Sequence, residues 1–172
     1  MPYVMVDIEA DGPIPGDFSM ISLGAIVVEP ALDRTFAARM RPISDHWVPE
    51  ALAVSGFSRE ETVAFPDPEP EMRRFGDWVK KLGGGQPVFV SDNNGFDWMF
   101  VCWYFHHFTD GNPFGFSSQN LGSLFKGMTK DMRASFKHLR KTKHTHDPVD
   151  DARGNAEAML HMIDAMGLKL SR

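Results

Sequence analysis

The segment Y-V-M-V-D-I-E, residues 3 to 9, predicts a buried strand that ends in two carboxylates. Residues 4 to 6 are all apolar, so both faces of this strand are expected to be covered, as in the centre of a sheet. Asp7 and Glu9 lie two residues apart, and the period-2 alternation of a strand points both side chains from one face. Two carboxylates about 4 Å apart repel by roughly 4 kcal/mol at an effective dielectric of about 20, which favours a bound divalent cation. A solvated strand end is the alternative interpretation of this short pattern.

Two further strand-like runs follow, at residues 20 to 29 and 34 to 41. Glycine and proline pairs interrupt the sequence around them, which predicts tight turns and an antiparallel meander. A short apolar strand is predicted at residues 87 to 91. Helical patterns follow a capping box at 58–61 and occupy residues 70–82, 96–108, 121–127 and 132–140, and a last helix opens near Pro148. These elements predict one α/β domain, residues 1 to 172, in which helices pack on a mixed sheet.

Length and composition limit the class of protein. The chain has 172 residues, of which 42% are hydrophobic, and this content suits a single core that buries about 70% of the surface exposed by the unfolded chain. We find no basic and apolar leader and no apolar run near the roughly 18 residues that span a bilayer, so we expect no membrane partner and a cytoplasmic location. The single cysteine, Cys102, lies in an apolar run and is expected to be a small buried hydrophobe.

The charge of the chain is unevenly distributed. A formal net charge of −5 disfavours a protein that coats long duplexes by neutralising phosphates alone. Residues 126 to 143, however, contain seven basic side chains, Lys137 among them, and a single acidic one, Asp131. This basic segment is either a solvated helical face or a track for the phosphates of a nucleic acid.

A second polar motif follows the strand predicted at residues 87 to 91. The sequence S-D-N-N-G-F-D, residues 91 to 97, passes from this strand into a helix and places Asp97 in the first helical turn. The helix dipole stabilises a carboxylate there, so Asp97 is interpreted either as a cap or as a metal ligand. Asp92, which is closer to the end of the strand, is a rival ligand.

A third motif, H-D-P-V-D-D at residues 146 to 151, opens the last helix, with Asp147 as its predicted N-cap. His146 and Asp151 are five residues apart, a spacing that lets a loop histidine fold back over a carboxylate in the first turn. An imidazole titrates near pH 6.5, so it is the natural base in a site whose carboxylates hold a metal. The alternatives are a zinc site that includes His144 and His146, and simple helix capping by Asp150 and Asp151.

Taken together, the three motifs resemble those of the DEDDh family of 3′–5′ exonucleases. The matching patterns are D-x-E at Asp7 and Glu9, N-x-x-F-D ending at Asp97, and H-x-x-x-x-D from His146 to Asp151. The resemblance extends from about residue 3 to residue 160. The family includes oligoribonuclease, RNase T and the proofreading subunits of DNA polymerases. Residues 146 to 158 are most similar to small stand-alone bacterial and phage exoribonuclease-like members. The resemblance implies an RNase H-like fold, with a mixed five-stranded sheet and helices on both faces.

The same resemblance implies two-metal hydrolysis that releases 5′-nucleoside monophosphates. Two Mg²⁺ or Mn²⁺ ions would be bound by Asp7, Glu9, Asp97 and Asp151, with His146 as general base. Ala10 and Asp92 depart from the family, which often has threonine and histidine at these two positions. The residues expected to contact substrate are Ala10, Phe18, Phe96, Trp98 and Lys137, although the aromatic residues among them also suit the core.

Single-stranded nucleic acid is the expected partner, and RNA is favoured over DNA. A DNA exonuclease of the proofreading or repair type is the first alternative, because the catalytic set does not encode the sugar. A catalytically silent nucleic-acid-binding module is the second. Relatives are often homodimers, so a homodimer is one arrangement that the resemblance implies.

Overall fold

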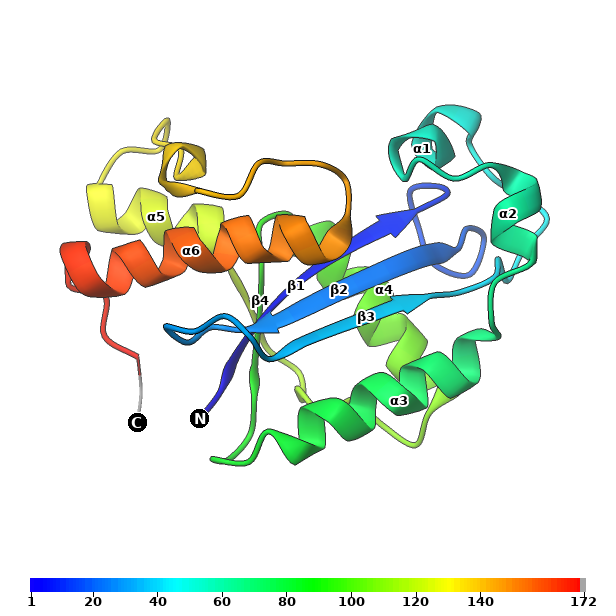
Figure 1. Cartoon of the computed structure of the whole chain (residues 1–172), viewed down its shortest axis with the longest axis horizontal. Helices are drawn as coiled ribbons and strands as arrows, with labels where there is room; N and C mark the ends of the chain where they lie inside the picture. The colour runs from blue at the N-terminus through cyan, green and yellow to red at the C-terminus, as the bar shows by residue number, and fades with distance from the viewer. Residues whose placement is uncertain (171–172) are drawn as a thin grey trace.

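A mixed five-stranded sheet forms the centre of the computed structural model, which describes residues 1–170 (Figure 1). The strands are β1 (Tyr3–Ala10), β2 (Met20–Val27), β3 (Thr35–Arg39), β4 (Val88–Ser91) and β5 (Ser118–Asn120). Their order in the sheet is β3-β2-β1-β4-β5; neighbours among β1 to β3 are antiparallel, while β4 and β5 run parallel to β1. The antiparallel meander and the central position of the first strand are confirmed.

Helices cover both faces of the sheet. They are α1 (Pro49–Val54), α2 (Arg59–Val63), α3 (Pro68–Lys81), α4 (Asn94–Phe108), α5 (Leu121–Thr129), the 3₁₀ turn η1 (Lys137–Leu139) and α6 (Pro148–Met166). Helices α3 and α4 pack on one face, and α5 and α6 pack on the other, as Figure 1 shows for α3 and α6. The expected fold class, α/β with helices on both faces of a five-stranded mixed sheet, is confirmed. Within residues 1–170, no helix is long and apolar enough to cross a membrane.

The alternation of side chains along β1 determines which face carries the carboxylates. Val6 and Ile8 belong to the core formed with α3 and α4, whereas Met5 belongs to the core under α5 and α6. Asp7 and Glu9 are in phase with Met5, so they lie on the α6 face. Strand β1 pairs with β4 only as far as Met5, so within residues 1–170 the end of β1 has no strand neighbour on that side.

Gly24 lets α6 approach β2 closely. A Cβ atom on Gly24 would lie 2.3 Å from the carbonyl carbon of Pro148 and 2.4 Å from the nitrogen of Val149, closer than non-bonded atoms come. Gly24 is also opposite Asp7 in the register of β1 and β2. The first turn of α6 therefore rests directly on the sheet beside Asp7, and this contact brings Asp151 to the end of β1.

Two local details differ from the sequence predictions. The prediction of a helix at residues 132–140 is wrong, because only the short η1 forms there. Helix α5 ends at Thr129 and is capped by Lys130, whose φ is 57°. The side chain of Asp131 then accepts a hydrogen bond from the Arg133 amide. Such local bonds between side chain and backbone compete with helix formation. The sequence pattern does not predict β5, because its three residues are all polar.

Candidate metal-binding and catalytic site

Three carboxylates converge at the end of β1. Oxygen atoms of Asp7, Glu9 and Asp151 lie within 4.8 Å of one another. Asp7 and Glu9 occupy alternate positions of β1, and Asp151 comes from the first turn of α6, where only 2% of the residue is exposed. The structure therefore brings together three of the four carboxylates expected to bind metal.

Asp97, the fourth expected ligand, enters from the start of α4. Because the chain turns from β4 into α4, Asp97 reaches the unpaired flank of β1 and accepts hydrogen bonds from Ser91 and from the backbone of Ile8. Its Oδ2 atom is buried and has no hydrogen-bond partner in the part of the chain that the structure describes. Burial raises the pKa of Asp97 to about 8, although these two hydrogen bonds lower it.

The carboxylates repel one another. Burial raises the pKa of Asp7 well above its usual value, and the charges of Asp97, Asp151 and Glu9 raise it further. Burial likewise raises the pKa of Glu9 to about 7, with the nearby His146 lowering it. Divalent cations would relieve this repulsion, because they replace protons that the carboxylates otherwise retain.

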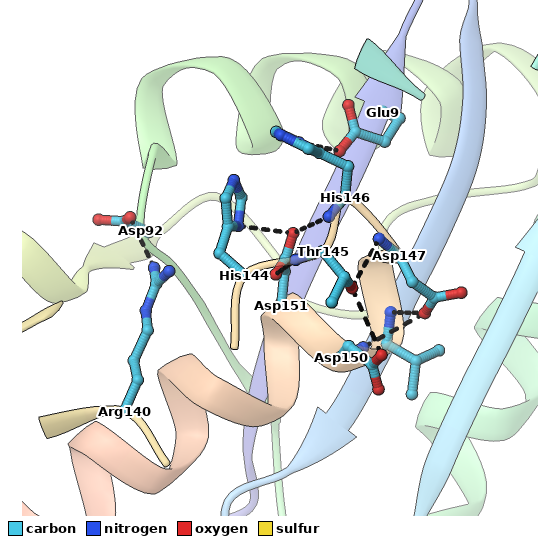
Figure 2. A network of polar contacts seen from close by, with 10 residues as sticks. Glu9, Asp92, Arg140, His144, Thr145, His146, Asp147, Asp150 and Asp151 are labelled. Atoms are coloured by element: carbon cyan, nitrogen blue, oxygen red, sulfur yellow. Dashed lines mark hydrogen bonds and ion pairs between the residues drawn. The ribbon is translucent and has the colours of Figure 1, made fainter. Parts of the chain in front are cut away.

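The loop before α6 is held in place by Asp151 (Figure 2). The backbone amides of Thr145 and His146 donate hydrogen bonds to its Oδ1 and Oδ2 atoms, at 3.1 and 3.0 Å. Nδ1 of His144 lies 2.8 Å from the same Oδ2 atom. Asp147 accepts hydrogen bonds from two amides in the first turn of α6, so its predicted role as N-cap is confirmed.

His146 lies between the carboxylates and solvent. Its Nδ1 atom is 3.5 Å from Oε1 of Glu9, and 45% of its side chain is exposed. The φ of His146 is 62°, a conformation that costs a non-glycine residue of the order of 1 kcal/mol and that the loop bonds to Asp151 offset. The imidazole thus contacts the carboxylate site and also has access to water, as a general base requires.

Arg140 is a charged neighbour that the sequence motifs do not single out. Its guanidinium donates a hydrogen bond of 3.0 Å to Asp92 and lies over the ring of Phe136. Only 10% of the Arg140 side chain is exposed. The charge of Arg140 also lowers the pKa of Asp7. Asp92, the rival ligand, is therefore engaged in an ion pair. The only sequence signal for Arg140 is its place in the basic segment 126–143.

Unpartnered polar atoms are concentrated around the carboxylates. Within residues 1–170, the buried side-chain atoms that lack a hydrogen-bond partner belong to Ser22, Asp97, Asn112, Arg140 and Asn155. Ser22 is paired with Glu9 in the sheet, and Asn155 lies one turn after Asp151 on α6. Buried polar groups are normally satisfied, so their concentration here fits a site that bound cations complete.

The five residues expected to contact substrate differ in burial and in their surroundings. Ala10 is buried at the end of β1, and the ring of Phe18 packs over the backbone of Gly12. Phe96 and Trp98 are half-buried against the core of the α3 and α4 face, which favours the core interpretation of both rings. Lys137 lies in η1 and lines a separate surface pocket.

A groove of about 640 Å³ opens beside His146, between β3, the segment 55–66 and the loop before α6. Within it the guanidinium of Arg39 lies 4.8 Å from the ring centre of Phe57 and 5.8 Å from that of Phe65. Aromatic rings and guanidinium planes are the surfaces on which proteins stack unpaired bases. The groove combines both, next to the histidine expected as base.

Comparison with known proteins supports this description. No protein-family model matches the chain. It is 35% identical over 181 aligned residues to the 3′-5′ DNA exonuclease Cap18 of Escherichia coli, covering 97% of this chain and 94% of that protein. The nuclease domain of 3′hExo, a DEDDh family member bound to rAMP, superposes with a TM-score of 0.76 and 16% identity, covering 99% of this chain and 96% of that chain. E. coli Exonuclease I with a dT13 oligonucleotide gives a TM-score of 0.75 and 15% identity, covering 96% of this chain and 41% of that chain.

The sheet order and the helices on both faces define an α/β protein of the RNase H-like class. Because its similarity to Cap18 extends over nearly its whole length, the chain belongs to the DEDDh family of 3′–5′ exonucleases. Members of this family use divalent metal ions. The expected preference for RNA over DNA is not supported, since the relative with 35% identity is named a DNA exonuclease.

Proposed function

We propose that this chain, as one exonuclease domain, removes nucleotides from the 3′ end of single-stranded DNA with the help of two Mg²⁺ or Mn²⁺ ions. The observation that carries the proposal is the cluster of Asp7, Glu9 and Asp151 within 4.8 Å, with His146 at 3.5 Å from Glu9. Membership of the DEDDh family supports the direction and type of reaction.

The four proposed ligands are Asp7, Glu9, Asp97 and Asp151. They offer only carboxylate oxygens, which magnesium and manganese prefer. The unpartnered oxygen of Asp97 and the raised pKa of Asp7 support a site that needs positive charge. Bound ions supply an activated water and stabilise the charge that develops on the phosphate.

His146 is the proposed general base. It would accept the proton of the attacking water, because its imidazole lies beside the carboxylates and is also open to solvent. The two hydrogen bonds from the loop backbone to Asp151 hold the imidazole beside Glu9. The position of the base is therefore coupled to a proposed metal ligand. The product is a 5′-nucleoside monophosphate.

Single-stranded DNA is the proposed substrate because Cap18 is named a DNA exonuclease and Exonuclease I is described with dT13. The Arg39 and Phe57 surface of the groove beside His146 is suited to an unstacked base. The basic segment 126–143, which includes the exposed Lys137, is suited to the phosphates of the incoming strand. Preference against RNA must come from contacts near the 2′ position, so it is tested directly.

The experiment follows 5′-labelled single-stranded DNA and RNA of one sequence over time, in Mg²⁺ or Mn²⁺. We expect a ladder that shortens from the 3′ end, faster on DNA than on RNA, while circular single-stranded DNA stays intact. Cleavage of the circle would show an endonuclease. Faster degradation of RNA would overturn the proposed substrate but not the proposed reaction.

Two matched variants connect the activity to the cluster. Asp7→Asn keeps the shape of the side chain but removes one charge, and we expect the ladder to disappear. Asp77→Asn makes the same exchange at an exposed position of α3, on the opposite face of the sheet, and should keep wild-type activity. Wild-type cleavage by Asp7→Asn would exclude the carboxylate cluster from the mechanism.

A further inference from the structure

His144, His146 and Asp151 form a second group of metal-ligand side chains, which overlaps the proposed two-metal site. One ligand atom from each of the three lies within 4.8 Å of the others. Nδ1 of His144 is 2.8 Å from Oδ2 of Asp151, and the two imidazole centres are 4.2 Å apart. Figure 2 shows both histidines beside the same carboxylate. His144 has no part in the proposed exonuclease reaction.

We propose that these three residues form an inhibitory zinc site, where Zn²⁺ binds and switches the exonuclease off. Two imidazole nitrogens and one carboxylate oxygen are a typical ligand set for zinc, with water in the fourth tetrahedral position. Magnesium and manganese prefer the oxygen-only group of Asp7, Glu9 and Asp151. The inhibitory effect rests on the proposed function, whereas the binding itself does not.

The three side chains can close around such an ion with small movements. Zinc bonds of about 2.0 to 2.2 Å place tetrahedral ligand atoms roughly 3.3 Å apart, and the three atoms already lie within 4.8 Å. The imidazoles of His144 and His146 are about half exposed, at 52% and 45%, so they are able to rotate. The side chain of Asp151 is 1% exposed at the start of α6 and provides a rigid anchor.

Zinc binding and the proposed two-metal arrangement exclude each other. Asp151 belongs to both groups of ligands, and His146 would leave its position 3.5 Å from Glu9 to bind zinc. Zinc therefore removes the proposed base and one ligand of the activating ions together. Sites with nitrogen ligands bind zinc more tightly than manganese, so inhibition is expected at zinc concentrations well below that of the activating ion.

Cobalt(II), a spectroscopic substitute for zinc, tests the binding without any measurement of activity. Tetrahedral cobalt absorbs visible light far more strongly than six-coordinate cobalt held by carboxylates and water. We expect one equivalent of Co²⁺ to give the intense spectrum with the wild type, and Zn²⁺ to displace it. His144→Gln should lose the spectrum, whereas His161→Gln, at an exposed position of α6, should keep it. A weak spectrum in the wild type, or an unchanged one in His144→Gln, would overturn the site.

The second measurement is zinc inhibition of DNA cleavage in saturating Mg²⁺. Loss of a partner that only supports a metal ligand reduces metal affinity by about 10- to 100-fold, so His144→Gln should raise the half-inhibitory zinc concentration at least about tenfold. His161→Gln should leave it unchanged. Equal inhibition of the wild type and His144→Gln would refute the inhibitory role. A wild type inactive in Mg²⁺ and Mn²⁺ would refute the proposed function instead, and the cobalt spectrum would still decide the zinc site.

Discussion

Replacing Asp97 by asparagine is expected to stabilise the metal-free protein at pH 8 but not at pH 4. The residue is 3% exposed, and burial is the main cause that raises its pKa from 3.8 to about 8. Between these two values the unfolded chain loses the proton while the folded protein retains it, so the free energy of unfolding falls as the pH rises. Asparagine carries no such proton and escapes this cost.

The magnitude follows from the pKa difference at Asp97. Each pKa unit corresponds to about 1.4 kcal/mol, so a rise from 3.8 to about 8 sets a ceiling of about 5 kcal/mol at pH 8. Part of the rise comes from the charges of Asp92 and Glu9, and asparagine weakens the hydrogen bonds from Ser91 and Ile8, so about 2 to 3 kcal/mol is expected. For a chain of this length, this is a Tm increase of roughly 4 to 12 °C.

The assay is a series of melting curves from pH 4 to pH 8 in the presence of a chelator. Asp77→Asn serves as the control for loss of an exposed carboxylate and should follow the wild type. The advantage of Asp97→Asn should grow from near zero at pH 4 to its full size at pH 8. A difference that does not change with pH would refute the reasoning, because charge burial would then not be its cause. Saturating Mn²⁺ should reverse the order, since the variant lacks a proposed ligand.

Four further predictions concern the metal, the base and the scaffold. Mn²⁺ at about 100 times its dissociation constant should stabilise the wild type by about 2.7 kcal/mol, or roughly 5 to 10 °C in Tm; an unchanged melting curve contradicts the carboxylate cluster. His146→Ala should keep this shift but lower turnover on labelled DNA by about 10² to 10⁴, and full turnover would exclude the residue as base. Arg59→Gln should lower the free energy of unfolding in urea by about 3 to 5 kcal/mol, because the fully buried Asp11 loses its ion partner at 2.9 Å. Adding Asp11→Asn should recover part of this stability. No recovery would argue against the buried charge as the cause. Gly24→Ala should lower the free energy of unfolding by about 1 to 3 kcal/mol and remove the Tm shift produced by Mn²⁺, because the alanine Cβ forces the start of α6 away from the sheet. A retained Mn²⁺ shift would show that this contact does not position the site.

Strands β1 to β3 and helix α3 are predicted from the sequence to within a few residues of their observed ends. Their apolar periodicity, turns and caps act over a few neighbouring residues, so the information is local. The same local rules fail at residues 132–140, where Asp131 and the residues after it form turns in place of a helix. They also fail at β5, a polar edge strand that exists only because β4 provides its hydrogen-bond partners.

The fold class, the family resemblance and the order of the three motifs can be read from the residues alone, because they depend on residue types at short spacings. Which side chains meet depends instead on how distant elements pack. The ion pair of Arg140 with Asp92 joins residues 48 positions apart. Because Gly24 has no side chain, α6 packs close enough to the sheet to bring Asp151 to β1. His144 reaches Asp151 only because the loop before α6 folds back on that carboxylate. Such contacts depend on packing between distant elements, which the period of a local pattern does not encode.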